Sequence, residues 1–236
     1  MRIVIAEYPK SGGTWICSLV GDALSLPKRD IYVCPEYKSY DFWKHPWYRN
    51  ASDLRVPKAC VIKSHELPQS TLHNFPNHLV HLVRDGRDVV ISKYFFESDF
   101  CVANGVYSEF GEPFDDYVSR VSAEWNQYVR AWMNAGIPYV RYEEFLADPI
   151  VALKHLLSLL GYTAPQRALA SAVEKNTKEK LHAALSETFE HNTFVRRGSA
   201  GDWRNYFQKR HVDIFANAAG EAMERLGYCM SLEPRD

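Results

Sequence analysis

The fold is decided by residues 2–15, which read RIVIAEYPKSGGTW. The apolar, β-branched run at the start of this stretch indicates a strand over residues 2–7. A turn that contains proline, lysine, serine and two glycines follows it, and apolar residues then recur at helical spacing from Trp15 to Leu24. The stretch therefore predicts a strand, a glycine-containing turn and a helix, which is the opening unit of an α/β fold.

The rest of the chain continues this alternation. Short β-branched runs predict three further strands, at residues 59–63, 79–83 and 137–141. Apolar periodicity predicts helices over about 87–96, 114–135, 148–160, 165–175 and 212–226. Two stretches rich in aromatic residues, 27–57 and 98–113, are expected to be irregular. The sequence thus predicts a single α/β domain over residues 1–236, with a central, mainly parallel β-sheet flanked by helices, similar to P-loop nucleotide-binding proteins.

Composition excludes several classes of function. The chain has 236 residues and a formal net charge of -1 at pH 7, which argues against general electrostatic binding to nucleic acid or to an anionic membrane. The five cysteines are widely spaced and form no CxxC pair, so thiols in a reducing compartment are favoured over zinc sites or disulfides. No apolar run reaches the ~20 residues of a membrane-spanning helix, and no signal peptide is recognisable. We expect a cytoplasmic protein.

The turn after the first strand has the features of an anion-binding site. Backbone N–H groups at the start of a helix have no partner within the helix, and the helix dipole favours negative charge there. Lys10 adds a positive charge, and Ser11 and Thr14 add hydroxyl donors. The lysine precedes the glycines, whereas the Walker pattern of ATPases and GTPases ends with its lysine. The alternative is an ordinary turn between strand and helix with an exposed lysine.

The turn YPKSGGTW resembles YPKSGTTW, the phosphosulfate-binding loop of the cytosolic sulfotransferase family. Four further segments resemble motifs of that family in the same order along the chain: KSHELP at 63–68, VRDGRDVVIS at 83–92, RYEE at 141–144 and RRGSAGDW at 196–203. The resemblance implies the sulfotransferase fold and a sulfotransferase activity. In that activity a sulfuryl group passes from 3'-phosphoadenosine-5'-phosphosulfate (PAPS) to the hydroxyl of a small-molecule acceptor by in-line displacement. The desulfated product nucleotide is PAP, and the resemblance implies no metal.

PAPS carries a phosphosulfate at one end and a 3'-phosphate at the other, so the resemblance implies two anion sites. The residues expected to hold the phosphosulfate are Lys10, Ser11, Gly12, Gly13 and Thr14. The residues expected to hold the 3'-phosphate are Arg84, Ser92, Arg196, Arg197 and Gly198, since guanidinium groups offer phosphate a planar fork of donors. Tyr142 is expected to contact the nucleotide. Trp15 resembles the tryptophan that stacks on adenine, with a place in the core as the alternative.

His65 is the expected general base. It ends a predicted strand, on the side where open α/β sheets bind ligands, and imidazole can take the proton of the acceptor hydroxyl. Lys63 lies two residues earlier, and it is expected to act with Lys10 on the charge that develops at the bridging oxygen.

The sequence departs from the family in places, and some questions stay open. Gly13 replaces a threonine, and the residues around Gln208 do not match the family's dimerisation motif, so no dimer is carried over. The rival functions are an ATP-dependent P-loop phosphotransferase and a nucleotide-binding module without catalysis. Aromatic residues of the two irregular stretches favour an apolar or phenolic acceptor, or else belong to the core. They are Tyr37, Tyr40, Phe42, Trp43, Trp47, Phe95, Phe96, Phe100 and Tyr107.

Overall fold

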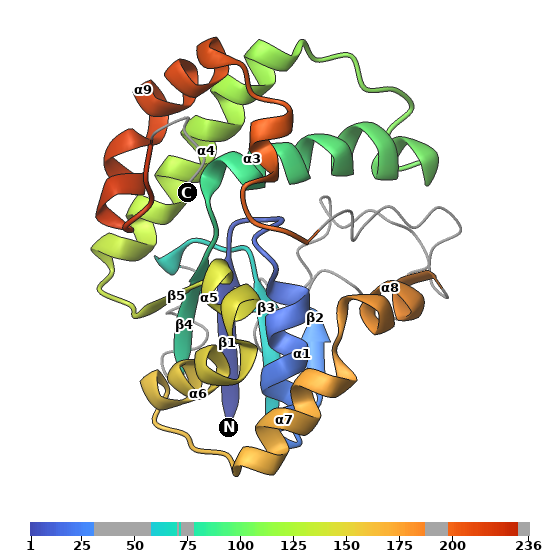
Figure 1. The fold of residues 1–236 in the computed structure, drawn as a ribbon, viewed down its shortest axis with the longest axis vertical. Coiled ribbons are helices and arrows are strands. Elements are labelled where there is room, and N and C mark those ends of the chain that lie inside the picture. The colour runs from blue at the N-terminus through green and yellow to red at the C-terminus, as the bar shows by residue number, and fades with distance from the viewer. Residues whose placement is uncertain (31–57, 70, 72–77, 187–197, 231–236) are drawn as a thin grey trace.

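The computed structural model describes residues 1–30, 58–69, 71, 78–186 and 198–230 of the chain. In this part, five strands form one sheet in the order β2-β3-β1-β4-β5, and every neighbouring pair is parallel (Figure 1). The strands are β1 (Arg2–Glu7), β2 (Lys28–Asp30), β3 (Cys60–Ser64), β4 (Leu79–Val83) and β5 (Tyr139–Arg141). The predicted fold class, an α/β fold around a parallel sheet, is confirmed.

The central strands are buried on both faces. Every residue of β3 and β4 is buried, and so is every residue of β1 except Arg2. Successive side chains of a strand point to opposite faces, so β1 contributes to two separate cores. Ile3 and Ile5 belong to one core, and Val4 and Ala6 belong to the other. This arrangement explains why the strand is apolar without alternation.

Helices cover both faces of the sheet (Figure 1). The first core packs α1 (Gly13–Leu24), α5 (Tyr142–Ala147), α6 (Pro149–Leu159) and α7 (Gln166–Lys175) against the sheet. The second core packs α3 (Gly86–Phe95), α4 (Phe114–Asn134) and α9 (Lys209–Arg225). Three short elements complete the described part: the π-helix η1 (Phe96–Cys101), α8 (Lys178–Ser186) and the 3₁₀-helix η2 (Asp202–Asn205).

Two elements extend into stretches that the sequence predicted to be irregular. Strand β2 has the sequence KRD, which carries no apolar pattern, and it pairs with β3 at the edge of the sheet. The π-helix η1 continues α3 into the stretch 98–113. The prediction of irregular structure was wrong for these two segments. The remainder of the first stretch, 31–57, lies outside the described residues.

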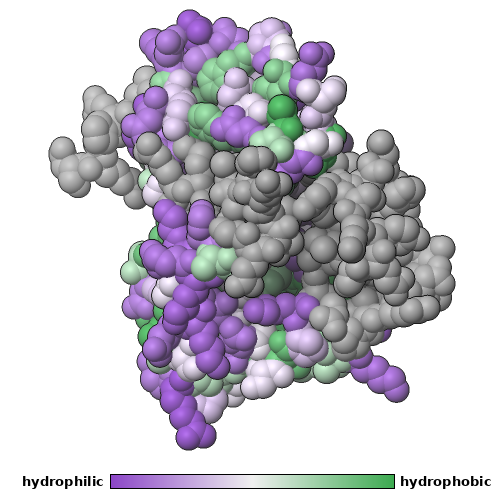
Figure 2. Space-filling model, turned by 90° about the vertical axis from the view of Figure 1, so that its right-hand side faces the viewer, coloured by the Kyte–Doolittle hydropathy of each residue, from purple (hydrophilic) through white to green (hydrophobic). Residues whose placement is uncertain are grey.

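No helix in the described part of the chain is both long enough and apolar enough to cross a membrane. The surface of the described residues in Figure 2 mixes hydrophilic and hydrophobic side chains. None of the four cysteines at described positions is joined in a disulfide, and no cluster of three or more potential metal ligands occurs among these residues.

We predict that the start of α6 depends on Asp148. The side chain of Asp148 accepts hydrogen bonds from the backbone N–H groups of Ile150 (3.1 Å) and Val151 (3.0 Å). Asp148→Ala removes this cap and should lower the free energy of unfolding by about 1 kcal/mol, whereas Asp148→Asn keeps an acceptor and should cost much less. Urea denaturation of the three proteins measures the difference. Equal losses in the two variants would contradict a capping role.

Candidate active site

The turn between β1 and α1 has a backbone that requires glycine at one position. Lys10 has a φ of 74° and Gly12 a φ of 104°, in the left-handed region that residues other than glycine adopt at a cost. A Cβ atom at Gly12 would lie 2.5 Å from Cδ2 of Tyr142, so the ring leaves no room for a side chain. The carbonyl of Gly12 accepts the N–H groups of Trp15 (3.0 Å) and Ile16 (3.2 Å) and thereby begins α1. We call residues 8–14 the donor loop.

Four neighbouring strands end at this loop. The residues that follow β3, β1, β4 and β5 directly are His65, Tyr8, Arg84 and Tyr142, in the order of the sheet. Since the strands are parallel, these residues lie at one edge of the sheet, where α/β proteins bind ligands. The structure therefore brings together four segments that the sequence predicted to form one site, including Tyr142 at the start of α5.

Lys10 and Lys63 lie close together inside the site. The pKa of the Lys10 ammonium is lowered from 10.5 to about 7, first by burial and then by the charge of Lys63, while the carboxylate of Glu7 acts in the opposite direction. The Lys10 ammonium lies 4.3 Å from the ring centre of Phe96, and Lys63 Nζ donates to Thr14 Oγ1 (3.2 Å). A cation with this pKa gains its proton readily when an anion arrives near neutral pH.

His65 is held in one tautomer. Its Nδ1 lies 3.0 Å from the carbonyl oxygen of Glu7. A carbonyl can only accept a hydrogen bond, so Nδ1 carries the proton of the neutral ring. The other nitrogen, Nε2, is then unprotonated and able to take a proton. This assignment follows from the hydrogen-bond geometry.

Arg84 and Tyr142 join the donor loop to the segment that begins at Gly198. Arg84 Nη1 donates to the Lys10 carbonyl and Nη2 to the Ser199 carbonyl, both at 3.1 Å. The guanidinium stacks on the Tyr142 ring, 4.7 Å from its centre, and the Tyr142 hydroxyl donates to the Gly198 carbonyl (3.3 Å). The Tyr142 ring thus packs against both Gly12 of the donor loop and the guanidinium of Arg84.

Asp88 on α3 fastens the segment 198–203, a role that the sequence analysis missed. Its carboxylate accepts the N–H groups of Gly201 (2.6 Å) and Trp203 (2.9 Å), and burial raises its pKa to about 6. The signal available in the sequence was an aspartate directly before an apolar run, Val89 to Ile91, because a charged residue is seldom buried unless it has partners. Ser92 lies on the same helix and is partly exposed. Arg196 and Arg197 lie outside the described residues.

Two buried polar atoms in the site have no hydrogen-bond partner within the described residues. They are the Ser11 hydroxyl oxygen, in the donor loop, and Arg84 Nε, at the end of β4. Leaving such atoms without a partner costs free energy, so native structures satisfy nearly all of them. One such atom lies in each of the two predicted anion sites, which fits a ligand with an anionic group at either end.

Trp15 packs against the protein on one side. Its ring lies edge-on to Tyr142 (5.8 Å between centres) and Phe145 (6.3 Å), and its indole N–H donates to the carbonyl of Asn176 (2.8 Å). The ring is partly exposed, so it has a share in the core and still presents surface.

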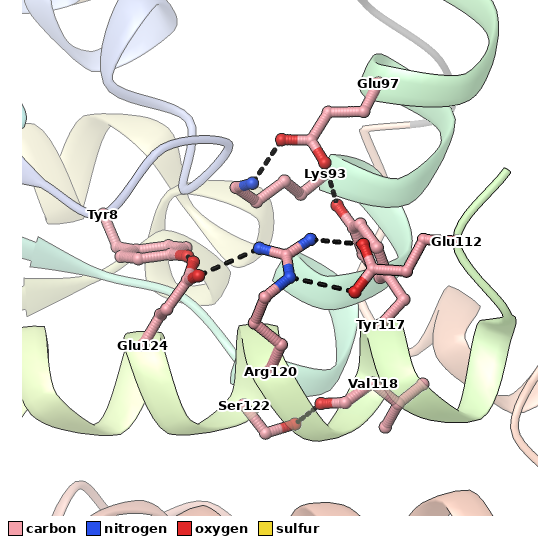
Figure 3. A network of polar contacts seen from close by, with 9 residues as sticks. All are labelled: Tyr8, Lys93, Glu97, Glu112, Tyr117, Val118, Arg120, Ser122 and Glu124. Carbon is pink, nitrogen blue, oxygen red and sulfur yellow. Dashed lines mark hydrogen bonds and ion pairs between the residues drawn. The ribbon is translucent and has the colours of Figure 1, made fainter. Parts of the chain in front are cut away.

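A network of charged residues fastens the donor loop to α4 (Figure 3). The Tyr8 hydroxyl donates to Glu124 (2.8 Å), and Arg120 bridges Glu124 (2.9 Å) and Glu112 (2.6 Å). Because Tyr8 opens the loop, these contacts restrain the backbone that leads to Lys10.

The same view contains a second, buried group of polar residues. Lys93 and Glu97 form an ion pair, and the Tyr117 hydroxyl donates to Glu97 (2.9 Å) (Figure 3). Nearby, Phe96 and Phe100 are buried and stacked (5.1 Å between centres). These two aromatic residues therefore pack in a small core, and the Phe96 ring also lies beside the Lys10 ammonium. Five of the aromatic residues named for the acceptor, Tyr37, Tyr40, Phe42, Trp43 and Trp47, lie outside the described residues.

Comparison with known proteins gives consistent matches. The family model described as sulfotransferase domain matches residues 1–227. Mouse sulfotransferase 1 family member D1 is 26% identical over 252 residues, which cover 94% of this chain and 83% of the relative. The crystal structure of mouse sulfotransferase SULT7A1 complexed with PAP is similar in fold, with a TM-score of 0.73 at 19% identity over 97% of this chain and 86% of that one. A structure of retinol dehydratase with retinol and PAP has a TM-score of 0.65 at 18% identity over 94% and 81% of the two chains.

Proposed function

Since the chain belongs to the sulfotransferase family and is a PAPS-dependent sulfotransferase, we propose that its donor loop, His65, Lys63 and Arg84 carry out the transfer. PAPS supplies the activated sulfuryl group. The chain's own residues bind its two anionic ends, take the proton of the acceptor hydroxyl and stabilise the charge left on the nucleotide. The family match sets aside the rival phosphotransferase.

The observation that carries this proposal is the contact between His65 and the carbonyl of Glu7, the residue before the donor loop. The Glu7 carbonyl holds Nδ1 of His65 at the end of β1, directly before the loop, so that Nε2 is the basic nitrogen. Nε2 is proposed to remove the proton from the acceptor hydroxyl as that oxygen attacks sulfur. Lys10 and Lys63 are proposed to stabilise the negative charge that grows on the leaving oxygen, where a preformed positive charge lowers the barrier most.

The two unpartnered polar atoms support the assignment of the nucleotide ends. The phosphosulfate is proposed to bind to the Ser11 hydroxyl, Thr14 and the backbone of the loop, and the 3'-phosphate to Arg84. Further contacts to the 3'-phosphate are proposed from Ser92, Arg196, Arg197 and Gly198. Trp15 is proposed to contact adenine with its exposed portion.

The acceptor is proposed to be a small molecule with a hydroxyl on an apolar or phenolic body. Support comes from the Phe96 ring beside Lys10 and from the retinol in the structure of retinol dehydratase. We propose one sulfotransferase domain over residues 1–236, acting in the cytoplasm, where widely spaced thiols stay reduced. No nucleic-acid or membrane partner is proposed, on the near-neutral net charge.

The proposal is tested by incubating the protein with a pooled library of hydroxyl compounds and either PAPS or ATP with Mg²⁺. Mass spectrometry should detect a sulfuryl group on a small molecule only with PAPS, together with release of PAP. Turnover with ATP alone, or tight PAP binding without any sulfated product from a chemically broad library, would contradict it.

We predict that His65→Ala lowers kcat by roughly 10²–10⁴-fold, the usual contribution of a general base. The dissociation constant of PAP should stay near that of the unmodified protein, because the proposed base does not hold the nucleotide. His155→Ala changes an exposed histidine on α6 and serves as the control. Near-normal turnover in a folded His65→Ala protein would refute the assignment.

We predict that Arg84→Ala distinguishes the two ends of the nucleotide. Losing a charged donor should weaken PAP binding by about 1.5–3 kcal/mol, whereas adenosine 5'-phosphosulfate, which has no 3'-phosphate, should bind almost as before. Titration calorimetry with both ligands measures this difference. Arg130→Ala, which removes a partly exposed arginine paired with Glu221, is the control. An equal loss for both ligands would mean that Arg84 acts by supporting the fold.

We predict that PAP affinity depends on pH through Lys10. The free protein holds this ammonium with a pKa of about 7, and a bound phosphate raises that pKa, so binding takes up a proton at higher pH. Affinity should therefore be highest below about pH 7 and fall by up to about tenfold per unit above it. Lys10→Arg stays charged and should show a flat profile between about pH 7 and 9. A flat profile in the unmodified protein would contradict the prediction.

A further inference from the structure

A buried carboxylate lies directly before the donor loop. Glu7 is the last residue of β1 and is only 2% exposed. Its Oε2 accepts the backbone N–H of Gly13, the first residue of α1, at 2.5 Å. In this structure a residue of the chain itself therefore occupies one of the helix-start donors that the sequence predicted for the phosphosulfate.

The space around Gly13 is matched to this carboxylate. A Cβ atom at Gly13 would lie less than 3.0 Å from both carboxylate oxygens and from Cδ of Glu7. Gly13 does not need glycine for its backbone, because it lies in a helix and is not among the residues with positive φ. The three atoms nearest to such a Cβ all belong to this carboxylate group, which therefore excludes a side chain here. Glu7 and Gly13 are thus a complementary pair.

The carboxylate also affects the charge of the loop. Glu7 raises the pKa of Lys10 against the effects of burial and of Lys63. It therefore acts on the same cation that the 5' anionic group of the nucleotide is proposed to meet. An incoming anion has to displace the carboxylate from the Gly13 N–H or bind beside it, and like charges at such short range repel.

We propose that Glu7 is an affinity-determining residue of the donor site, a resident anion that weakens binding at the 5' end of the nucleotide and requires glycine at position 13. The proposal rests on the proposed function, which assigns the donor loop to that end. Since PAP carries a 5'-phosphate at the same place, the resident carboxylate also weakens the hold on the product and favours its release.

The test compares four proteins: the unmodified chain, Glu7→Gln, Gly13→Thr and the double variant Glu7→Ala with Gly13→Thr. Each is titrated by calorimetry with PAP and with adenosine 3'-monophosphate, which has no 5' anion, at about pH 6, below the pKa of about 7 that Lys10 has in the unmodified chain. Glu7→Gln keeps an oxygen for the Gly13 N–H and removes the charge, so PAP affinity should rise about tenfold. Affinity for the monophosphate should not change.

Gly13→Thr alone should weaken PAP binding by about tenfold or more, because the new side chain meets the carboxylate. The double variant removes that conflict and should bind PAP at least as tightly as the unmodified chain. Gly220→Thr is the control, since a Cβ at Gly220 of α9 meets nothing within 4 Å. If Gly13→Thr does not fold, recovery of folding and PAP binding in the double variant supports the pair.

Three outcomes would overturn the proposal. Glu7→Gln could leave PAP affinity unchanged or lower it, both ligands could shift equally, or the double variant could bind no better than Gly13→Thr. Failure of the proposed function itself would show in the unmodified protein, before any variant is compared. If the unmodified protein binds PAP no more tightly than the monophosphate, the donor loop does not hold the 5' end, and both proposals fall together.

Discussion

The site depends on the parallel pairing of β1 with β3 on one side and β4 on the other. The register places Ala6 beside Ser64 and Glu7 beside Leu82, so the three strands end almost level. Burial of the apolar side chains on both faces of these strands specifies this register, and the backbone hydrogen bonds of the parallel ladder then hold it. Residues that are far apart in the chain are consequently delivered to one edge of the sheet, each by the first turn after its strand. If β1 were shifted by one residue, the donor loop and His65 would no longer face each other.

Burial around this edge is what gives ordinary side chains their chemical properties. Desolvation brings the pKa of Lys10 down to about 7 and that of Asp88 up to about 6, so both groups are close to changing their charge near neutral pH. The carbonyl of Glu7 selects the tautomer of His65 through one contact. Tyr142 fills the space beneath Gly12 and Arg84, which keeps the loop and the guanidinium in place without adding a charge. The protein fold supplies these environments before any ligand arrives.

The sequence predicted the parts of this arrangement that follow from local pattern. β1 and β4 have the predicted boundaries, because a short, uninterrupted apolar run is typical of a strand that is buried on both faces of a parallel sheet. β2 was missed, since its three residues form a strand only by pairing with β3. The same reason explains the missed contacts of Glu7 and Asp88. Their partners, Gly13 and the segment 201–203, are brought to them by the tertiary fold, and no spacing along the chain reports that proximity. Motif resemblance identified Lys10, His65 and Arg84 but could not reveal what touches them.

The site contains both buried cations and buried carboxylates, and a bound nucleotide would change the balance between their charges. Glu7 acts electrostatically on Lys10, and Arg84 acts on Asp88; with Lys63, most of these groups are buried. In a medium of low effective dielectric constant, such cations are held at a cost unless an anion accompanies them. Glu7 provides part of that negative charge from within the chain. A nucleotide with an anionic group at each end would provide the rest, and it would do so at the two positions where Ser11 and Arg84 have polar atoms without a described partner. Stability of the empty site and affinity for the nucleotide therefore oppose each other. Glu7, at the end of β1, is the residue that adjusts the balance between them.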